Sequence, residues 1–502
     1  MNDPLFTALF EVLRFENLFA SFIGVTFGLF IGMMPGLTVS LGMVLLLPLT
    51  YKLSAISSVC LLLGLYASGM TGGSFSAVLI NIPGTPSASA TALDGHPMAR
   101  NGRAGEALGI AVIASFFGGI FGLVCLSVAA PVIARVALNF GAPELFAIVL
   151  LGLTLICSFG RESNIKGLLS GIIGLIIMTV GLDPMMGTPR FTFDSVELQA
   201  GISFLPAMIG LFAIPQIIRG LSGKSSVIPQ YDEKVSGVLP KLRNLVKLVK
   251  SMLIGSTIGT GVGAIPGTGG PIAVFLAYDY ARKASKAGNR FGKGEPEGVA
   301  APEAANNAVA GGALIPMLTL GIPGDPITAI LLGALLIHGL IPGPLLFSQN
   351  AHFVYAVFWA YLVANIMNIT VSLSTIKLWV RVLKVPERIL IPIIVVVCIV
   401  GTYGLRNTFF DTGVMLAFGI MAFFMSKYGF PVVPMLLAIV LGPTLESNLR
   451  MSLIIADGDW MVFFRQPISL GFILLSVVTF FGPLLLPAIR SRFKKPCQEN
   501  TP

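Results

Sequence analysis

Long apolar runs with almost no charge between them are the feature that most restricts what this chain can fold into. They span residues 18–50, 54–80, 105–138, 143–159, 165–182, 201–219, 251–278, 299–346, 352–380, 389–404, 411–447 and 467–489. Only 11% of the 502 residues are charged, whereas soluble domains average about 25%. Since a transmembrane helix needs about 20 apolar residues, the 55% that are hydrophobic supply about ten to twelve spans. We expect a polytopic integral membrane protein.

The spans are expected to be helices. Backbone groups at bilayer depth must find hydrogen-bond partners within the protein, which restricts spans to helices or closed barrels. The runs are continuous and lack the period-2 alternation of barrel strands, so the predicted fold class is all-α polytopic. The sequence has no P-loop, so we expect any uphill work to draw on an ion gradient or on another subunit.

A motif of glycines with a Pro-Gly pair occurs twice. Glycines at every fourth position lead from Gly24 to Pro35-Gly36, and the same spacing recurs 231 residues later, from Gly255 to Pro266-Gly267. A second motif, from Gly72 through residues 82–86, recurs at an offset of 240 from Gly312 through 322–326. The nine extra residues fit the polar stretch 279–298. The two motifs in the same order predict two homologous halves.

Basic residues predict that the two halves are inverted. Seven Lys and Arg residues lie in 219–250 and five in 279–298, on both sides of the second Pro-Gly motif, whereas Arg14 and Lys52 flank the first. Positive flanks lie in the cytoplasm, so each broken helix is expected to form a re-entrant hairpin, from opposite faces. The predicted organisation is a first repeat (1–218), a basic cytoplasmic linker (219–250), a second repeat (251–489) and a basic cytoplasmic tail (490–502).

The helix breaks and the short polar side chains beside them are the predicted binding residues. Proline removes an N–H and glycine relaxes the backbone, so each break frees backbone groups that suit an ion or a carboxylate. The candidate substrate-binding residues are Pro35, Gly36, Thr38, Ser74, Ser76, Asn81, Gly84, Thr85, Pro266, Gly267, Thr268, Gly269, Asn306, Asn307, Pro323, Gly324 and Asp325. Among them, Asn81, Thr85, Asn307 and Asp325 are the candidate Na⁺ ligands.

Three carboxylates lie near the breaks, and for each we weigh a functional role, since ionisable groups at membrane depth are usually functional, against a structural one. Asp325 follows Pro323-Gly324 and could ligate a cation, carry a proton or cap the next helix. Asp94, in Asp-Gly-His-Pro, is typical of a turn at the membrane face. Glu303 shares a helix face with Asn306 and Asn307, or lies at the interface.

Other function classes have weak support. The net charge of +9 comes from short basic segments between apolar runs, so no nucleic-acid partner is expected. The five cysteines have no metal-site spacing, and no cofactor is expected. Tyr278-Asp279 with Gly324-Asp325 is faintly similar to an intramembrane aspartyl protease, but the Gly-x-Gly-Asp pattern is missing. The chain is predicted not to be an enzyme.

Five segments resemble the large membrane subunit of the tripartite tricarboxylate transporters. They are residues 72–85 (GGSFSAVLINIPGT), 94–99 (DGHPMA), 291–294 (FGKG), 297–308 (EGVAAPEAANNA) and 320–324 (LGIPG). The resemblance implies a permease in the bacterial inner membrane that acts with a small membrane subunit and a periplasmic solute-binding protein. It implies import of carboxylates such as citrate, driven by Na⁺ or H⁺, and leaves the oligomeric state open. A passive anion channel built on the same breaks is the alternative.

Overall fold

The computed structural model of the chain describes residues 3–158, 164–221, 238, 240, 242–382 and 387–493. It divides into two compact units, one of residues 1–139 and 203–427 and the other of residues 140–202 and 428–502. Within the described ranges, six helices are long and apolar enough to cross a bilayer, and further apolar helices are shorter. The predicted all-α polytopic membrane fold is confirmed.

The first unit is helical throughout its described length. Its elements are α1 (Pro4–Val12), α2 (Phe15–Met33), α3 (Val39–Thr50), α4 (Ala55–Ile80), the 3₁₀ helix η1 (Pro86–Ala88), α5 (Ser89–Met98), the π-helix η2 (Ala99–Arg103), α6 (Ala104–Ala137), α10 (Phe204–Leu221), α11 (Leu242–Gly263), α12 (Gly269–Ala284), the 3₁₀ helix η3 (Gly288–Arg290), α13 (Glu297–Leu320), α14 (Pro326–Ile337), α15 (Pro344–Gln349), α16 (Ala351–Val382), α17 (Glu387–Arg406) and α18 (Phe409–Lys427).

The second unit adds a short β-ribbon to its helices. Its elements are α7 (Ala142–Ser158), α8 (Asn164–Met178), β1 (Gly181–Leu182), β2 (Pro189–Arg190), α9 (Val196–Gln199), α19 (Val433–Ile455), α20 (Val462–Arg465) and α21 (Pro467–Phe493). The two strands pair antiparallel, with Gly181 opposite Arg190. In this unit α7, α8 and α19 pack on one another. In the first unit α10, α17 and α18 likewise pack on one another.

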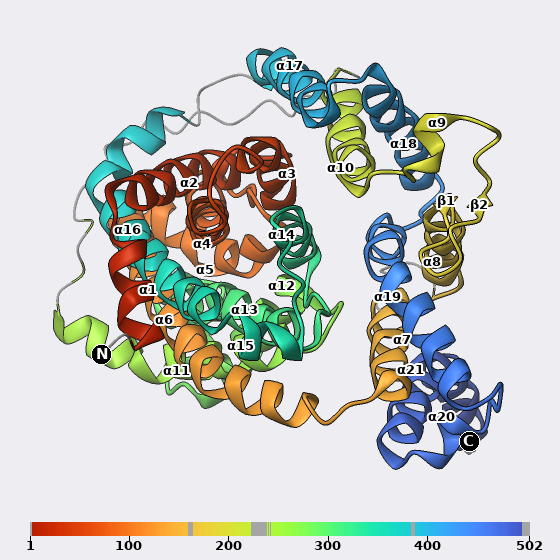
Figure 1. Ribbon diagram of the computed structural model, residues 1–502. Coiled ribbons are helices and arrows are strands. Elements are labelled where there is room, and N and C mark those ends of the chain that lie inside the picture. The colour runs from red at the N-terminus through yellow and green to blue at the C-terminus, as the bar shows by residue number, and fades with distance from the viewer. Residues whose placement is uncertain are drawn as a thin grey trace, which may run out of the picture. The chain divides into compact units, whose positions relative to one another are not determined.

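Two buried helices, α4 and α13, form the centre of the first unit. Every residue from Ile56 to Ile80 of α4 is buried, and so is every residue from Gly298 to Thr319 of α13. Figure 1 shows α4 nearly end-on, with α2 and α3 on one side and α13 on the other. A helix buried on all sides must be apolar or small-sided all round. This explains why neither helix has a polar face.

The two predicted halves make equivalent contacts. A Cβ atom on Gly24 of α2 would lie 2.0 Å from the carbonyl oxygen of Leu61 of α4. On Gly255 of α11 it would lie 2.1 Å from the carbonyl oxygen of Ala301 of α13, and Leu61 and Ala301 are 240 positions apart. The contact recurs one turn on, at Gly28 and Gly259. The glycine motif thus packs α2 on α4 and α11 on α13 at backbone distance.

A long helix of each half also packs on the central helix of the other half. α6, from the first half, packs on α13, and α16, from the second half, packs on α4. A Cβ on Gly118 of α6 would lie 2.0 Å from the carbonyl oxygen of Ala304. The two halves are therefore intertwined within one compact unit, so sequence repeats and compact units have different boundaries. The predicted repeat boundaries stay a prediction.

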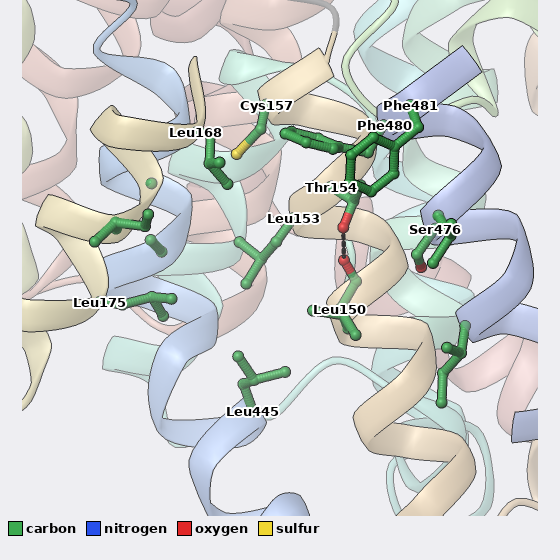
Figure 2. Close-up of a pocket in the computed structure, with 15 residues that line it drawn as sticks. Leu150, Leu153, Thr154, Cys157, Leu168, Leu175, Leu445, Ser476, Phe480 and Phe481 are labelled. Atoms are coloured by element: carbon green, nitrogen blue, oxygen red, sulfur yellow. Dashed lines mark hydrogen bonds between the residues drawn. The ribbon is translucent and has the colours of Figure 1, made fainter. Parts of the chain in front are cut away.

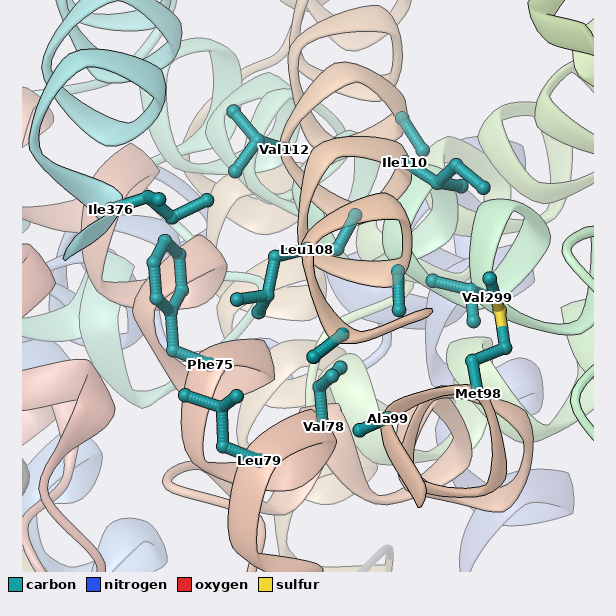
Figure 3. Close-up of a cluster of buried hydrophobic side chains, with 14 of the residues drawn as sticks. Phe75, Val78, Leu79, Met98, Ala99, Leu108, Ile110, Val112, Val299 and Ile376 are labelled. Carbon is teal, nitrogen blue, oxygen red and sulfur yellow. The ribbon is translucent and has the colours of Figure 1, made fainter. Parts of the chain in front are cut away.

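An apolar core joins α2, α4, α6, α13 and α16 with α5, η2 and α11. Figure 3 shows Phe75, Val78 and Leu79 of α4 facing Leu108 and Val112 of α6, with Ile376 of α16 beside them. Val25, Leu29 and Met33 of α2 and Val299 of α13 complete the contact. Burial of large apolar side chains contributes about 1.5–3 kcal/mol each. This cluster therefore holds α4 in a fixed position against its neighbours.

The polar segments predicted around the second motif lie partly within helices. The nine-residue insertion falls where expected, since α12 runs four residues longer than α3 and is followed by η3. The predicted linker 219–250 is helical at its described ends, in α10 and α11, while 222–237, 239 and 241 lie outside the described residues. Of the predicted tail 490–502, residues 490–493 belong to α21 and 494–502 lie outside them.

Candidate functional site

Four helix breaks in the first unit form two pairs. Each predicted Pro-Gly pair falls between helices, at 34–38, 81–85, 264–268 and 321–325. A Cβ on Gly84 would lie 2.0 Å from the carbonyl oxygen of Gly32, and one on Gly324 would lie 2.6 Å from that of Gly263. The N–H of Gly267 donates to the carbonyl oxygen of Gly324 at 3.0 Å. The structure therefore brings the two breaks of each half together.

The local sequence determines how α4 and α13 end. α4 ends at Asn81 (φ 59°) and α13 at Gly321 (φ 72°), both left-handed, which glycine and asparagine tolerate best. The next helical segments begin with proline, where its missing N–H and fixed φ are favourable. Thr85 and Asp325 precede those prolines in extended conformation and occupy equivalent positions, 240 residues apart.

Asp325 is buried and fully engaged. Its Oδ1 accepts the N–H of Thr328 at 2.7 Å and the Thr328 hydroxyl at 2.8 Å, which caps α14. Its Oδ2 accepts the hydroxyl of Tyr66 of α4 at 2.5 Å. The side chain is only 5% exposed. The capping interpretation of Asp325 is therefore confirmed, and its second oxygen ties α14 to α4.

Asn306 lies at the position of α13 that corresponds to Tyr66 in α4. Its Nδ2 donates to the carbonyl oxygen of Met70 at 3.1 Å. Its Oδ1 is buried without a hydrogen-bond partner among the described residues. That oxygen faces the start of α12, 3.6 Å from where a Cβ on Gly270 would lie, beside Ser87 of η1. Leaving a buried oxygen without a hydrogen bond costs about 1–3 kcal/mol, so such an atom in a folded protein favours a site where a ligand or ion binds.

Asn307 belongs to a separate polar chain between α4, α13 and α16. Its Oδ1 accepts the hydroxyl of Thr71 at 3.4 Å, and Thr71 accepts Nδ2 of Asn368 at 2.9 Å. Ser372 donates to Asn368 at 3.1 Å. The Nδ2 of Asn307 is buried and has no partner in the described part of the chain. This amide could donate to an anion.

The other candidate side chains bond within their own segments. Thr38 accepts the N–H of Leu41 at 3.1 Å, and Ser74 and Ser76 donate to carbonyls of α4. Thr268 donates to the carbonyl oxygen of Val262 at 2.6 Å. Three of the four candidate Na⁺ ligands bond to different groups: Thr85 contacts Ser87, Asn307 contacts Thr71 and Asp325 contacts Tyr66. The fourth, Asn81, is exposed, and none of the four bonds to another within the described ranges.

The turn expected at Asp94 is wrong, because the residue lies inside α5. Its carboxylate accepts the backbone N–H groups of Gly292, Gly294 and Glu295 at 2.8–3.0 Å and the hydroxyl of Tyr278 at 2.8 Å. These bonds hold the loop after α12 against α5 and outweigh the local preference for a turn. The sequence segment around position 292 carried no signal of such a contact.

Glu303 lies in the core, not at the interface. It is fully buried in α13 and accepts the hydroxyls of Thr91 of α5 and Ser115 of α6, the second at 3.0 Å. Tyr66 and Asn368, which lie within apolar runs, and Ser87, which lies between two such runs, were missed as site residues because nothing in the local sequence indicates their contacts. The offset of 240, which aligns Tyr66 with Asn306, was the signal that could have found the first of them.

Two cavities lie elsewhere. One of about 430 Å³ is lined by Arg103, Lys247, Arg290, Lys293 and three glutamates near η3. In that cavity burial, followed by the charge of Glu297, raises the pKa of Glu295. The second, of about 320 Å³, belongs to the second unit, and Figure 2 shows its wall of Leu150, Leu153, Phe480 and other apolar side chains. The hydroxyl of Thr154 there donates to Leu150 of its own helix, so the wall offers little to a polar ligand.

Comparison with known proteins identifies the family. Residues 18–437, which contain all four breaks, match the tripartite tricarboxylate transporter TctA family. The chain belongs to this family. The resemblance seen in the five sequence segments is thereby confirmed, and it extends from α2 into α19. The family match and the apolar helices together support a multi-pass membrane protein of a transporter family.

Two relatives of this TctA-family chain come from Agrobacterium vitis. An uncharacterized 52.8 kDa protein in the TAR-I ttuC' 3' region is 38% identical over 479 residues, 95% of each chain. An uncharacterized protein in the TAR-II ttuC' 3' region is 38% identical over 234 residues, which are 47% of this chain and 96% of that protein. No solved structure matches this TctA-family chain.

Proposed function

We propose that this chain is the permease subunit of a secondary transporter that imports carboxylates of the tricarboxylate class, citrate among them, across the bacterial inner membrane. It acts with a small membrane subunit and a periplasmic solute-binding protein, and a Na⁺ or H⁺ gradient drives it. Family membership supports the transport class. The substrate class, the partners and the driving ion are the added proposal, and no catalytic step is part of it.

The paired breaks carry this proposal. Two incompletely bonded amides, Asn306 and Asn307, lie in the buried middle of α13, and Oδ1 of Asn306 faces the start of α12, directly after a break. Buried polar groups are nearly always paired, so unpaired atoms at a helix break favour a ligand site over simple packing. Broken helices that meet at mid-membrane are typical of secondary transporters.

The charge distribution supports an inverted arrangement of the halves. The break at Pro266-Gly267 has basic segments on both sides, whereas the equivalent break at Pro35-Gly36 has few basic residues beside it. Equivalent glycine contacts in α2–α4 and α11–α13 support a similar fold for the two copies. Two such copies in opposite orientation provide two similar conformations, one open to each side, which alternating access requires.

The coupling ion is assigned to the polar residues beside the breaks. Asp325 is the ionisable one, held by Tyr66 and Thr328, and it is our candidate for H⁺ or Na⁺. Asn81, Thr85 and Asn307 are the neutral candidates for a Na⁺ site, through oxygen atoms that suit this ion. An ionisable side chain at membrane depth is expensive and usually functional.

Uptake of labelled citrate into membrane vesicles tests the proposal. Vesicles should contain this chain, the small subunit and the binding protein, with or without a Na⁺ or H⁺ gradient. We expect saturable uptake that needs the binding protein and stops when the gradient is dissipated. Uptake by this chain alone at an undiminished rate contradicts the proposal. Ionic currents faster than a carrier can support indicate the passive anion channel instead.

A further inference from the structure

We infer that the starts of α3 and α12 differ in role, and that the N-terminus of α12 with Asn306 and Ser87 binds a hydroxycarboxylate. The carboxylate lies on the backbone N–H groups of Gly269 and Gly270, and the hydroxyl donates to Oδ1 of Asn306. The equivalent site at the start of α3 is closed by the side chains of Tyr66 and Asp325, which bond to each other. The inference rests on the proposed function and adds to it which half-site binds substrate and which substrate group it recognises.

The comparison of the two half-sites is position by position. The first half-site consists of Thr38 and Val39 at the start of α3, together with Tyr66, Asp325 and Ile327 from α4 and α14, which pack on α3. The second half-site has their repeat equivalents. These are Gly269, Gly270, Asn306, Thr85 and Ser87. Every large or charged side chain of the first half-site is replaced in the second by glycine, a small hydroxyl or a neutral amide.

The first half-site has its polar side chains satisfied. Thr38 caps α3 by accepting the N–H of Leu41 at 3.1 Å. Asp325 accepts the hydroxyl of Tyr66 at 2.5 Å. Val39 is 3% exposed, and its side chain packs 2.9 Å from where a Cβ on Gly69 would lie. A ligand at this position would have to break bonds already made.

The second half-site has free donors. Position 269, equivalent to the capping residue Thr38, is a glycine with φ 67°, so no side chain caps α12. The N–H groups of Gly269 and Gly270 make no hydrogen bond to the described residues. α12 has 16 residues, and the N-terminus of such a helix attracts anions through its free N–H groups and its dipole. Gly267 and Gly269 are partly exposed, so a ligand can reach this end.

The second half-site also has a free acceptor. Oδ1 of Asn306 is unpartnered although the residue is 0% exposed, and it faces Gly270. The bond from Nδ2 to the carbonyl oxygen of Met70 fixes which amide atom faces the site. A carboxylate cannot satisfy an acceptor, whereas a hydroxyl can. Free donors beside a free acceptor therefore fit a carboxylate that carries a hydroxyl group.

Glycine at position 270 is required by the space. A Cβ there would lie 2.9 Å from Cβ of Ser87 and 3.6 Å from Oδ1 of Asn306. A side chain at this position would therefore press on Ser87 and move the start of α12 away from Asn306. The first half has valine at the equivalent position, which is consistent with its closed state.

Binding of L-malate and succinate, which differ by one hydroxyl, tests the inference. The purified permease in lipid nanodiscs is titrated with each acid by calorimetry. We expect L-malate to bind wild type about tenfold more tightly than succinate, since a lost buried hydrogen bond costs about 1–3 kcal/mol. Asn306→Ala should reduce this ratio to about one and leave the Kd of succinate within about threefold. Gly270→Val should weaken both acids at least about tenfold.

A matched control separates the site from general damage. Asn365→Ala removes another buried amide whose Oδ1 is unpartnered, on α16 against Gly119, and should leave the affinity ratio unchanged. Melting curves of each variant check that it is folded. Equal affinity of the two acids for wild type, or a ratio that survives Asn306→Ala, overturns the inference. Loss of gradient-driven uptake in wild type would instead overturn the proposed function.

Discussion

The hydroxyl of Tyr66 donates a 2.5 Å hydrogen bond to the carboxylate of Asp325, and these two buried residues lie 259 positions apart in the sequence. Tyr66 is central in α4, and Asp325 caps α14, so one bond joins the two homologous halves. The equivalent positions, Asn306 and Thr85, have no such bond. One half-site is closed and the other keeps an unpaired oxygen.

Tyr66→Phe should destabilise the protein without changing the affinity for substrate. Asp325 loses one of its hydrogen-bond donors in a buried place, which costs about 1–3 kcal/mol. We expect a lower melting temperature in thermal unfolding of the purified protein. The control Tyr355→Phe removes a hydroxyl that bonds to no described residue and should melt like wild type. An unchanged melting temperature for Tyr66→Phe would show that the bond adds nothing to stability.

Asn307→Ala and Asp325→Asn should alter cation dependence of uptake. The first removes the amide that bonds to Thr71, and the second removes the ionisable group while keeping an oxygen that can cap α14. We expect at least one of the two to raise the Na⁺ concentration, or shift the pH, at which uptake is half-maximal, by about tenfold or one pH unit. Normal cation dependence in both would exclude them from the coupling site.

Gly259→Ala should destabilise α11, whereas Gly261→Ala on the same helix should not. A Cβ on Gly259 would lie 2.3 Å from the carbonyl oxygen of Ala305, while nothing lies within 4 Å of one on Gly261. Overpacking costs about 1–3 kcal/mol, and alanine at an open helix position gains about 0.5–1 kcal/mol over glycine. Melting temperatures that fall equally in both variants would contradict the close contact of α11 with α13.

Asp183→Asn should lower the melting temperature in a pH-dependent way. The N–H groups of Met186 and Met185, followed by Arg450, lower the pKa of Asp183 from 3.8 to about 2. Since the folded-state pKa is the lower one, the stabilisation is complete above about pH 4 and is lost as the pH falls through about 2. The difference between wild type and variant should therefore be constant from pH 5 to 8 and disappear near about pH 2.

The control for this prediction is another carboxylate of the same loop. Asp194→Asn changes a side chain that makes no hydrogen bond or ion pair to the described residues, so its melting temperature should follow wild type at each pH. A difference for Asp183→Asn that stays the same down to pH 2 would show that its ionised form does not stabilise the second unit.

The sequence predicted the class of fold and the places where its helices break. Apolar runs determine that the chain lies in a membrane. A proline followed by a glycine removes an N–H and relaxes the backbone, so the breaks at Pro35, Pro83, Pro266 and Pro323 could be predicted one by one, whereas lone prolines such as Pro302 lie inside helices. The pairing of α2 with α4 and of α11 with α13, at Gly24 and Gly255, became visible only in the structure.

The sequence did not predict contacts that depend on tertiary structure. The residues around Asp94 predict a turn. The structure instead has Asp94 in a helix, where it accepts three backbone N–H groups of a loop about 200 positions away. Tyr66 is one polar group in an apolar run, and only its contact with Asp325 gives it a role. Such pairings are determined by packing of distant segments and have no local signal.

The location of a bound carboxylate tests the account most directly. We expect a structure of the permease in lipid nanodiscs with L-malate to show the acid at the start of α12. Its carboxylate should be within hydrogen-bond distance of the N–H groups of Gly269 and Gly270, and its hydroxyl should be near Oδ1 of Asn306. Density at the Tyr66–Asp325 pair, or only in the basic cavity lined by Arg103, Arg290 and Lys293, would contradict the account.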